Sequence, residues 1–211
     1  KYDVEGPDAA EFLRRITANR IPKKDGGIVL THALNENGVF ETEFTLTRLA
    51  EDRFYLLSGA ACEVRDMDLL PQSLNGNEKV TITNVTDDRG VLVVAGPKSR
   101  DVLAGLTKAD LSNDSFRWLT GQEIEIAGVA LRALRVNYVG ELGWELHCPM
   151  DDMVALYDAI WDSGQAHGIA DFGVYAVNSM RLEKAYKGYG AELTNEITMI
   201  EADMDRFYNL D

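Results

Sequence analysis

The four residues Asn35-Glu36-Asn37-Gly38 constrain the fold more than any other stretch, because they predict a β-hairpin. An Asn-Gly pair tolerates the positive φ angles that tight hairpin turns need. The residues before the turn, 28–34, are mostly apolar, and those after it, 39–47, alternate between apolar and polar side chains. Such alternation is typical of a strand with one buried face. Two strands joined by so short a turn are antiparallel, so the sequence predicts an antiparallel sheet.

Other stretches predict a mixture of strands and helices. Short apolar or alternating runs predict strands at 2–5, 54–57, 79–85 and 91–95, and a second hairpin over 124–138. Apolar residues at helical spacing predict helices that begin at Gly6-Pro7, over 62–70 with a stop at Pro71, and over 153–165 and 174–186. Hairpins combined with separate helices are typical of the α+β class, in which helices pack on antiparallel sheets. We therefore predict an α+β fold.

One short pattern occurs twice in the sequence. Val4-Glu5-Gly6-Pro7 is matched by Val94-Ala95-Gly96-Pro97. Leu13 and Ile16 follow the first copy at the same spacing as Leu103 and Leu106 follow the second. Each copy predicts a strand, a Gly-Pro turn and a helix, since proline is favoured in the first turn of a helix. The two copies indicate two similar α+β halves. The alternative is that Gly-Pro simply begins helices well.

The composition excludes several classes of partner. The net charge is −14, from 21 basic and 35 acidic residues, and a field of this sign repels phosphate backbones and anionic lipids. No apolar run approaches the roughly 20 residues that a membrane span needs. We expect no nucleic-acid partner and no membrane partner. The histidines and cysteines show no metal-ligand spacing, so we expect no metal site; these residues are His32, His147, His167, Cys62 and Cys148.

The stretch 138–146, Tyr-Val-Gly-Glu-Leu-Gly-Trp-Glu-Leu, ends one predicted strand, turns at its glycines and begins another. Tyr138 and Glu145 flank this turn, so both side chains could face one pocket. A carboxylate in a partly buried pocket needs hydrogen-bond donors. The edge of an amino-pyrimidinone ring offers two parallel N–H donors and suits a bidentate carboxylate. The alternative is a solvent-exposed Glu145 at a strand end and a Tyr138 in the core.

The pattern Tyr-x-Gly-Glu-x-Gly-Trp-Glu resembles the signature of the glycine-cleavage aminomethyltransferase family. Other segments resemble the dimethylglycine and sarcosine dehydrogenase branch of that family, nearly from end to end and in order. These segments are 21–24, 34–38, 46–56, 155–160, 181–185 and 192–196. The resemblance implies that Tyr138 and Glu145 hold the pterin of tetrahydrofolate.

The resemblance also implies a domain organisation. It predicts two interlocked aminomethyltransferase-type subdomains, approximately 1–58 together with 139–211, and 59–138. It further implies that the chain is a fragment of a longer protein and that the C-terminal barrel of the family is absent from it. This expectation fits the first residues, Lys1-Tyr2-Asp3-Val4-Glu5, because they already have the alternating pattern of a strand.

Glu43 is the candidate catalytic residue implied by the resemblance. The aminomethyltransferases carry an Asp after the hairpin where this sequence has Glu43, and they have Gly-Gly where this sequence has Gly38-Val39. The longer side chain of Glu43 moves the carboxylate by about one methylene, and catalytic geometry is sensitive to shifts near 1 Å. The alternative is that Glu43 belongs to the outward-facing, polar side of its strand.

Two further residues are implied to lie near the folate. Arg181, Lys184 and Lys187 are spaced three residues apart, which would place them roughly on one helix face. An arginine binds carboxylates bidentately, and the glutamate tail of folate carries such groups. The resemblance implies that Arg181 lies near the folate. Tyr189 matches an aromatic residue near the same pocket. The alternative is that these basic side chains form a solvated helix face.

The implied activity is transfer of a one-carbon unit from a small methylated amine to tetrahydrofolate, giving 5,10-methylenetetrahydrofolate. In the dehydrogenase branch a separate FAD-containing domain of the same polypeptide makes the iminium; this chain has no flavin motif. The expected location is the cytoplasm for a bacterial protein and the mitochondrial matrix for a eukaryotic one. Two alternatives remain open: a folate-binding or structural module without turnover, and a folate-dependent demethylase of a sulfonium compound.

Overall fold

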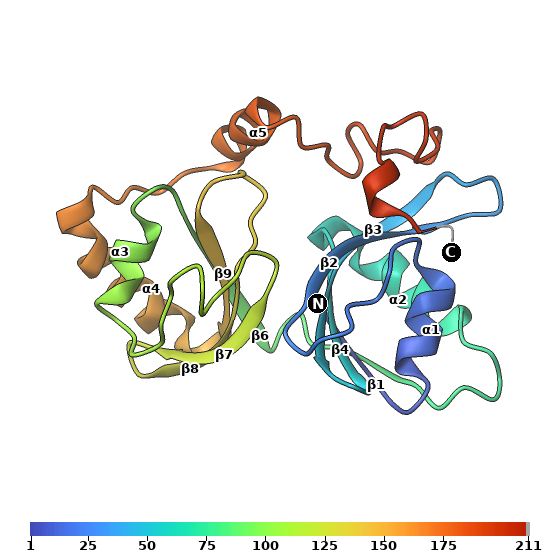
Figure 1. The fold of residues 1–211 in the computed structure, drawn as a ribbon, viewed down its shortest axis with the longest axis horizontal. Helices are drawn as coiled ribbons and strands as arrows, with labels where there is room; N and C mark the ends of the chain where they lie inside the picture. Colours follow the sequence, from blue (N-terminus) through green and yellow to red (C-terminus); the bar gives the residue numbers. More distant parts are fainter. Residues whose placement is uncertain (210–211) are drawn as a thin grey trace. The chain divides into compact units, whose positions relative to one another are not determined.

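The structure is a computed structural model, and it describes residues 1–209. The chain forms two compact units. Unit 1 contains residues 1–85 and the chain from residue 187 onward, and unit 2 contains residues 86–186. Each unit is built from an antiparallel sheet with helices beside it (Figure 1). The predicted α+β class is therefore confirmed.

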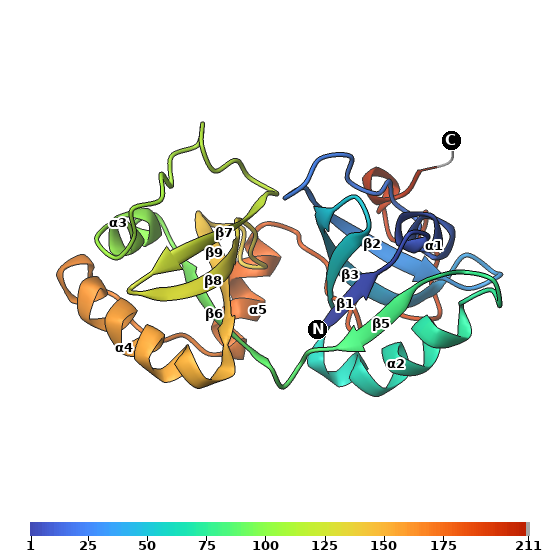
Figure 2. The ribbon, with the colours of Figure 1, turned by 90° about the horizontal axis from the view of Figure 1, so that it is seen from below.

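Unit 1 contains a five-stranded sheet with the order β2-β3-β4-β1-β5, in which all neighbouring strands are antiparallel. The strands are β1 (Tyr2–Glu5), β2 (Ile28–Leu34), β3 (Phe40–Ala50), β4 (Arg53–Leu57) and β5 (Thr81–Asn84). The predicted Asn35–Gly38 turn joins β2 and β3, and Gly38 has the positive φ of 76° expected there. Figure 2 shows β5 beside β1 at one edge of this sheet.

Two helices cover one face of the unit 1 sheet. They are α1 (Ala9–Ile16) and α2 (Glu63–Gln72). Phe12 and Leu13 of α1 and Leu70 of α2 are buried in one core with Phe44 and other apolar side chains of the strands. A second, smaller cluster joins Phe40 of β3 to Leu193, Met199, Ala202 and Met204. The residues after 187 therefore complete the core of unit 1.

Unit 2 contains a four-stranded antiparallel sheet with the order β6-β9-β8-β7. Its strands are β6 (Arg89–Ala95), β7 (Gly121–Ile126), β8 (Val129–Leu134) and β9 (Gly143–Pro149), and its helices are α3 (Ser99–Ala104), α4 (Met153–Gly164) and α5 (Val174–Glu183). Trp144 and Leu146 of β9 are fully buried against Leu103 of α3 and Leu156 of α4. Short 3₁₀ turns occur at Ala60–Cys62, Met150–Asp152, Gln165–His167 and Asp205–Phe207.

The repeated Gly-Pro pattern has the same local structure in both units. Gly6 follows β1 with a φ of 134°, and Gly96 follows β6 with a φ of 125°. In both copies the glycine carbonyl accepts a hydrogen bond from the amide three residues later, at 2.9 Å in unit 1 and 3.0 Å in unit 2. The φ angles lie in a region that side chains rarely adopt, so glycine is required at both positions. The predicted strand–turn–helix repeat is confirmed.

The unit boundaries differ from the division expected from the sequence, which was 1–58 with 139–211, and 59–138. Residues 59–85 lie in unit 1 because β5 pairs with β1 and because Leu70 is in the core of that unit. Residues 139–186 lie in unit 2 because β9 pairs with both β6 and β8. These boundaries are determined by pairing between strands that are far apart in the sequence, and local sequence patterns do not predict such pairing.

Two helix ends also differ from prediction. Pro71 lies inside the last turn of α2 and does not end the helix before it. Helix α5 ends at Glu183, three residues earlier than expected, because Ala185 adopts a positive φ of 55° that a helix cannot continue through. None of the helices described here is both long and apolar enough to cross a membrane.

Candidate functional site

The turn before Glu145 is held by one asparagine. The Asn137 amide donates to the carbonyl of Glu141 at 2.8 Å, and its side-chain oxygen accepts from the amide of Val139 at 3.1 Å. Gly140 has a positive φ of 70° at the bend, a conformation that favours glycine. Strand β9 then begins at Gly143. The motif is therefore an ordered turn that leads directly into a central strand.

Glu145 lies in the middle of β9, on the sheet face opposite the core. Alternation puts Trp144 and Leu146 in the core and puts Glu145 and His147 on the other face. The side chain of Glu145 is only 22% exposed, and its Oε2 lies 3.3 Å from Nε2 of the buried His147. Leu134 of β8 lies directly opposite Glu145 in the sheet. Glu145 is therefore a half-buried carboxylate with a fixed direction, and it does not point into bulk water.

Arg181 and Tyr138 form a stacked pair. The guanidinium carbon of Arg181 lies 6.0 Å from the centre of the Tyr138 ring. Arg181 is 5% exposed, and it donates to Asn178 Oδ1 at 2.7 Å and 2.9 Å and to the carbonyl of Tyr186 at 2.9 Å. Tyr138 itself is 40% exposed. The buried guanidinium therefore supports one face of a partly exposed aromatic ring.

The basic helix face expected from Arg181, Lys184 and Lys187 does not form, and this prediction was wrong. Lys184 is the cap residue after α5 and pairs with Glu141 at 3.1 Å. Lys187 belongs to unit 1, where its ammonium group donates to the carbonyl of Ala202. The early end of α5 removes the helical spacing on which the expectation depended.

Glu43 lies in unit 1, in the middle of β3, where it is directly opposite His32 of β2. Its Oε2 is 2.9 Å from Nε2 of His32, which is fully buried, while the Glu43 side chain is 24% exposed. Thr42 and Phe44 point to the other face and are fully buried. The predicted alternation therefore holds from Thr42 onward, but the register shift puts Phe40 on the face of His32 and Glu43. Glu43 is paired and half-buried on that face.

Three residues that the sequence reasoning missed lie near Glu43 and Tyr189. Arg65 of α2 stacks over the Tyr189 ring at 5.1 Å from the ring centre, and the Tyr189 hydroxyl donates to the carbonyl of Glu41 at 2.7 Å. Burial raises the pKa of the Cys62 thiol, and the nearby carboxylate of Glu43 raises this pKa further. Burial also raises the pKa of Tyr189. His32 therefore contacts Glu43, Arg65 contacts Tyr189, and Cys62 lies near both predicted residues of unit 1.

The five predicted site residues are divided between the units. Tyr138, Glu145 and Arg181 belong to unit 2, whereas Glu43 and Tyr189 belong to unit 1. Within unit 2, Tyr138 contacts Arg181. Within unit 1, Glu43 and Tyr189 share Cys62 as an electrostatic neighbour. Among the described residues, no three His, Cys, Asp or Glu side chains converge to form a metal-binding group.

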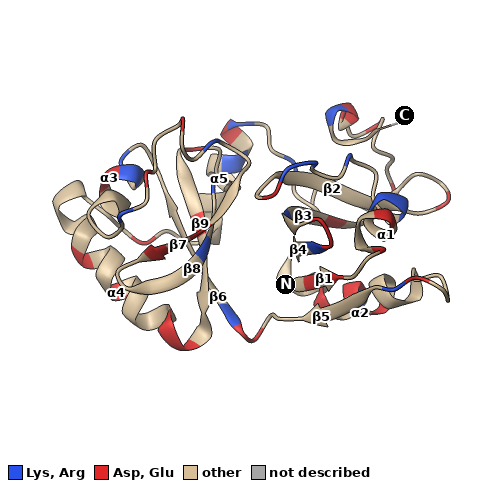
Figure 3. Cartoon of the chain, turned by 60° about the horizontal axis from the view of Figure 1, so that its bottom comes forward, with Lys and Arg blue, Asp and Glu red and all other residues tan. Residues whose placement is uncertain are grey.

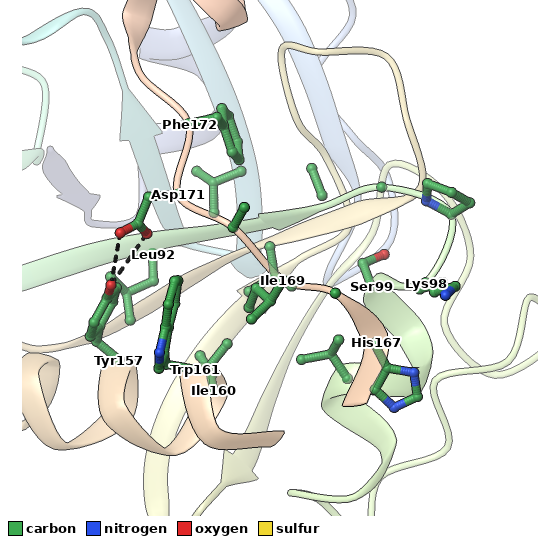
Figure 4. Close-up of a pocket in the computed structure, with 18 of the residues that line it drawn as sticks. Leu92, Lys98, Ser99, Tyr157, Ile160, Trp161, His167, Ile169, Asp171 and Phe172 are labelled. Atoms are coloured by element: carbon green, nitrogen blue, oxygen red, sulfur yellow. Dashed lines mark hydrogen bonds between the residues drawn. The ribbon is translucent and has the colours of Figure 1, made fainter. Parts of the chain in front are cut away.

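A cavity of about 700 Å³ lies elsewhere in unit 2, between β6, the end of α4 and the segment that leads to α5 (Figure 4). Its lining is mostly apolar and includes Trp161 and Phe172. The Tyr157 hydroxyl donates to Asp171 at 3.0 Å and 3.2 Å at one side of it. Acidic residues mark the adjacent helix α4 in Figure 3. None of the five predicted site residues lines this cavity.

The comparisons with known proteins show the family. The family described as the GCVT N-terminal domain matches residues 1–211. The chain therefore belongs to this family, and the resemblance drawn from the Tyr138–Glu145 motif and the collinear segments is confirmed.

Two relatives are the mitochondrial dimethylglycine dehydrogenase of Homo sapiens and the aminomethyltransferase of Natranaerobius thermophilus. The first is 39% identical over 211 residues, which is 100% of this chain and 24% of that protein. The second is 31% identical over 208 residues, which is 98% of this chain and 56% of that protein. Both relatives are enzymes, and the chain spans about a quarter of the first and about half of the second.

A solved structure has the same fold. The crystal structure of glycine cleavage system aminomethyltransferase T from Bartonella henselae superposes with a TM-score of 0.82 at 28% identity. The match covers 94% of this chain and 52% of that chain. The predicted aminomethyltransferase-type α+β architecture is therefore confirmed.

Proposed function

We propose that this chain is the tetrahydrofolate-binding part of an enzyme that transfers a one-carbon unit from a methylated amine to tetrahydrofolate. The observation that carries the proposal is Glu145, a half-buried carboxylate fixed in a central strand within the family motif. A carboxylate in this environment costs solvation free energy unless a donor pairs with it. A ligand edge with two N–H donors would supply that pairing.

The residues of unit 2 fit a reduced pterin. The two oxygens of a carboxylate such as Glu145 can accept two parallel hydrogen bonds, as the amino-pyrimidinone edge requires. Contact with His147 at 3.3 Å limits the rotation of the carboxylate. Tyr138 offers a 40% exposed ring for stacking, and Arg181 supports it. The folate-binding roles of Tyr138, Arg181 and Tyr189 stay predictions, and for Arg181 the proposed role is to hold the Tyr138 ring.

Glu43 would supply the negative charge for the reaction. Bound tetrahydrofolate supplies an amine nitrogen that attacks the one-carbon unit. A carboxylate near that carbon stabilises its positive charge, or it accepts the proton that the attacking nitrogen loses. Glu43 is 24% exposed, so it is accessible to a ligand, and its bond to His32 fixes the direction of the group. Holding both reactants in attack geometry would contribute several kcal/mol to the rate.

The context of the whole protein is part of the proposal. In a protein like the dimethylglycine dehydrogenase relative, an FAD-containing domain in the same polypeptide would oxidise the methylated amine. The iminium would then reach the folate site without release as formaldehyde. A eukaryotic protein of this kind would be expected in the mitochondrial matrix, as the name of the human relative states for that protein, and a bacterial one in the cytoplasm.

The first experiment tests folate binding. Glu145→Gln replaces one acceptor oxygen by a donor, so the affinity for tetrahydrofolate should fall by more than about tenfold, which corresponds to about 1.4 kcal/mol. Fluorescence titration of the protein with tetrahydrofolate measures the dissociation constant. Glu141→Gln is the matched control, because Glu141 lies in the same motif but forms an exposed pair with Lys184. Equal affinities of the two variants would refute the pterin assignment.

The second experiment tests Glu43. The full-length protein is supplied with dimethylglycine and tetrahydrofolate, and the ratio of methylenetetrahydrofolate to formaldehyde is measured. Glu43→Ala should lower this ratio while the dissociation constant for tetrahydrofolate changes little, because the carboxylate acts on the carbon being transferred. Glu36→Ala, in the exposed hairpin turn, is the control. A wild-type ratio for Glu43→Ala would leave this chain as a folate-binding module without a chemical role for Glu43.

A further inference from the structure

His32 is placed to hold the side chain of Glu43 in one position. The two residues face each other across β2 and β3, and their Nε2 and Oε2 atoms are 2.9 Å apart. The imidazole is fully buried, and Phe40 packs edge-on against it at 5.0 Å between ring centres. Cross-strand pairing and ring packing together restrict the histidine to one orientation.

The surroundings of the ring decide which nitrogen carries a proton. Nδ1 of His32 is buried and has no hydrogen-bond partner among the residues that the structure describes. A proton on Nδ1 alone would therefore be a buried donor without an acceptor, which is unfavourable. That tautomer would also direct the Nε2 lone pair at the Glu43 carboxylate. With a proton on Nε2, the ring donates to a carboxylate, and such charge-assisted bonds are stronger than neutral ones.

This bond leaves one oxygen of Glu43 available. Within the described chain no other group donates to Glu43, so Oε2 is bound to His32 and Oε1 has no hydrogen bond. The carboxylate is 24% exposed whereas the histidine is fully buried, so the free oxygen lies on the accessible side of the pair. A glutamate has several rotatable bonds, and fixing one oxygen reduces the number of directions that the other can take.

We propose that His32 is a positioning residue: its Nε2–H holds Oε2 of Glu43 so that Oε1 is presented to the one-carbon unit. This inference rests on the proposed role of Glu43. Neither His32 nor Glu43 belongs to the larger apolar cluster of unit 1, which packs on the opposite face of β3. The role of His32 would therefore be seen in the fate of the transferred carbon.

The test compares two variants in the full-length protein supplied with dimethylglycine and tetrahydrofolate. His32→Leu removes the donor, and it should lower the ratio of methylenetetrahydrofolate to formaldehyde by about tenfold to about a hundredfold, because a misplaced carboxylate loses attack geometry. His32→Gln keeps an N–H donor, and the ratio should stay within about threefold of wild type. The dissociation constant for tetrahydrofolate should be unchanged in both variants. In a Glu43→Ala background, His32→Leu should have no further effect, because the pair acts as a unit.

The outcomes separate the inference from the proposed function. If Glu43→Ala leaves the ratio unchanged, the proposed chemistry at Glu43 fails. If Glu43→Ala lowers the ratio but His32→Leu does not, only the inference about His32 is overturned. A ratio for His32→Gln as low as that for His32→Leu would also overturn it, because the retained donor would then have no effect.

A spectroscopic measurement on the wild-type protein keeps the inference falsifiable if a variant fails to fold. The ring signals of His32 are assigned through their contacts with the ring protons of Phe40, since the two ring centres lie 5.0 Å apart. Long-range ¹H–¹⁵N correlation distinguishes the protonated ring nitrogen from the unprotonated one. We expect a proton on Nε2 of His32. A neutral ring protonated at Nδ1 would overturn the proposal.

Discussion

Gly143→Ala should destabilise unit 2, because a methyl group at this position meets the backbone of the neighbouring strand. The added Cβ would lie 2.6 Å from the carbonyl oxygen of Val94 and 2.9 Å from Cα of Ala95. It would also lie 3.0 Å from the side-chain nitrogen of Asn137, which holds the turn by its bond to Glu141. Backbone atoms cannot rotate away, so we expect an overpacking cost of about 3 kcal/mol. Alanine also has fewer backbone conformations than glycine in the unfolded chain, and this effect offsets about 0.7 kcal/mol of the cost.

The net loss of about 2 kcal/mol corresponds to a fall of about 10 °C in the melting temperature of a unit of about 100 residues. Urea unfolding followed by tryptophan fluorescence reports on unit 2 alone, because that unit contains all three tryptophans: Trp118, Trp144 and Trp161. Gly105→Ala is the control, since its Cβ would meet only Ser163 Oγ, at 3.8 Å. Equal unfolding midpoints for the two variants would show that the close strand approach at Gly143 does not limit the residue there.

Two further predictions concern buried polar groups. Burial, together with the bond from its hydroxyl to Asp66, raises the pKa of Tyr2 from 10.0 to about 12. The phenol ionises near pH 10 in the unfolded chain and only near pH 12 in the folded one, so the stabilisation is complete below pH 10 and is lost above it. The free energy of unfolding should therefore fall by about 2 kcal/mol between pH 10 and pH 12. Circular dichroism with urea measures this, and an identical fall in Tyr2→Phe would contradict it. Arg181→Lys should lower the free energy of unfolding by about 1 to 3 kcal/mol, because a single ammonium cannot replace the planar donors to Asn178 and Tyr186. An unchanged unfolding midpoint in the tryptophan assay would exclude this role of the Arg181 guanidinium.

Local sequence patterns predicted the elements well and the pairing between distant elements poorly. The hairpin at Asn35–Gly38, the alternation of β3 from Thr42 onward and both Gly-Pro turns depend on neighbouring residues, and the structure contains them. The unit boundaries depend on which strands pair, for example β5 with β1. Which strands pair is determined by the burial of side chains that are far apart in the sequence, so the spacing of residues along the chain does not predict the pairing.

The residues of the candidate site were likewise predicted where they depend on a local motif and missed where they depend on contacts between distant elements. Glu145 and Tyr138 belong to one short motif, and both were identified from the sequence. His32 was missed as the partner of Glu43 because the β2–β3 register shifts at a bulge between Ala33 and Leu34. The pairing of Leu34 with Phe40, continued without this shift, would place His32 opposite Thr42. Arg65 was missed because only tertiary packing of α2 brings it over Tyr189.

The order in which the chain is synthesised has a consequence for unit 1. Phe40 is fully buried by residues that come after position 187, including Leu193 and Met199. A ribosome makes all of unit 2, residues 86–186, before it makes this covering segment. The nascent first half therefore emerges with an apolar side of β3 still uncovered, and unit 2 is complete before that side can be closed.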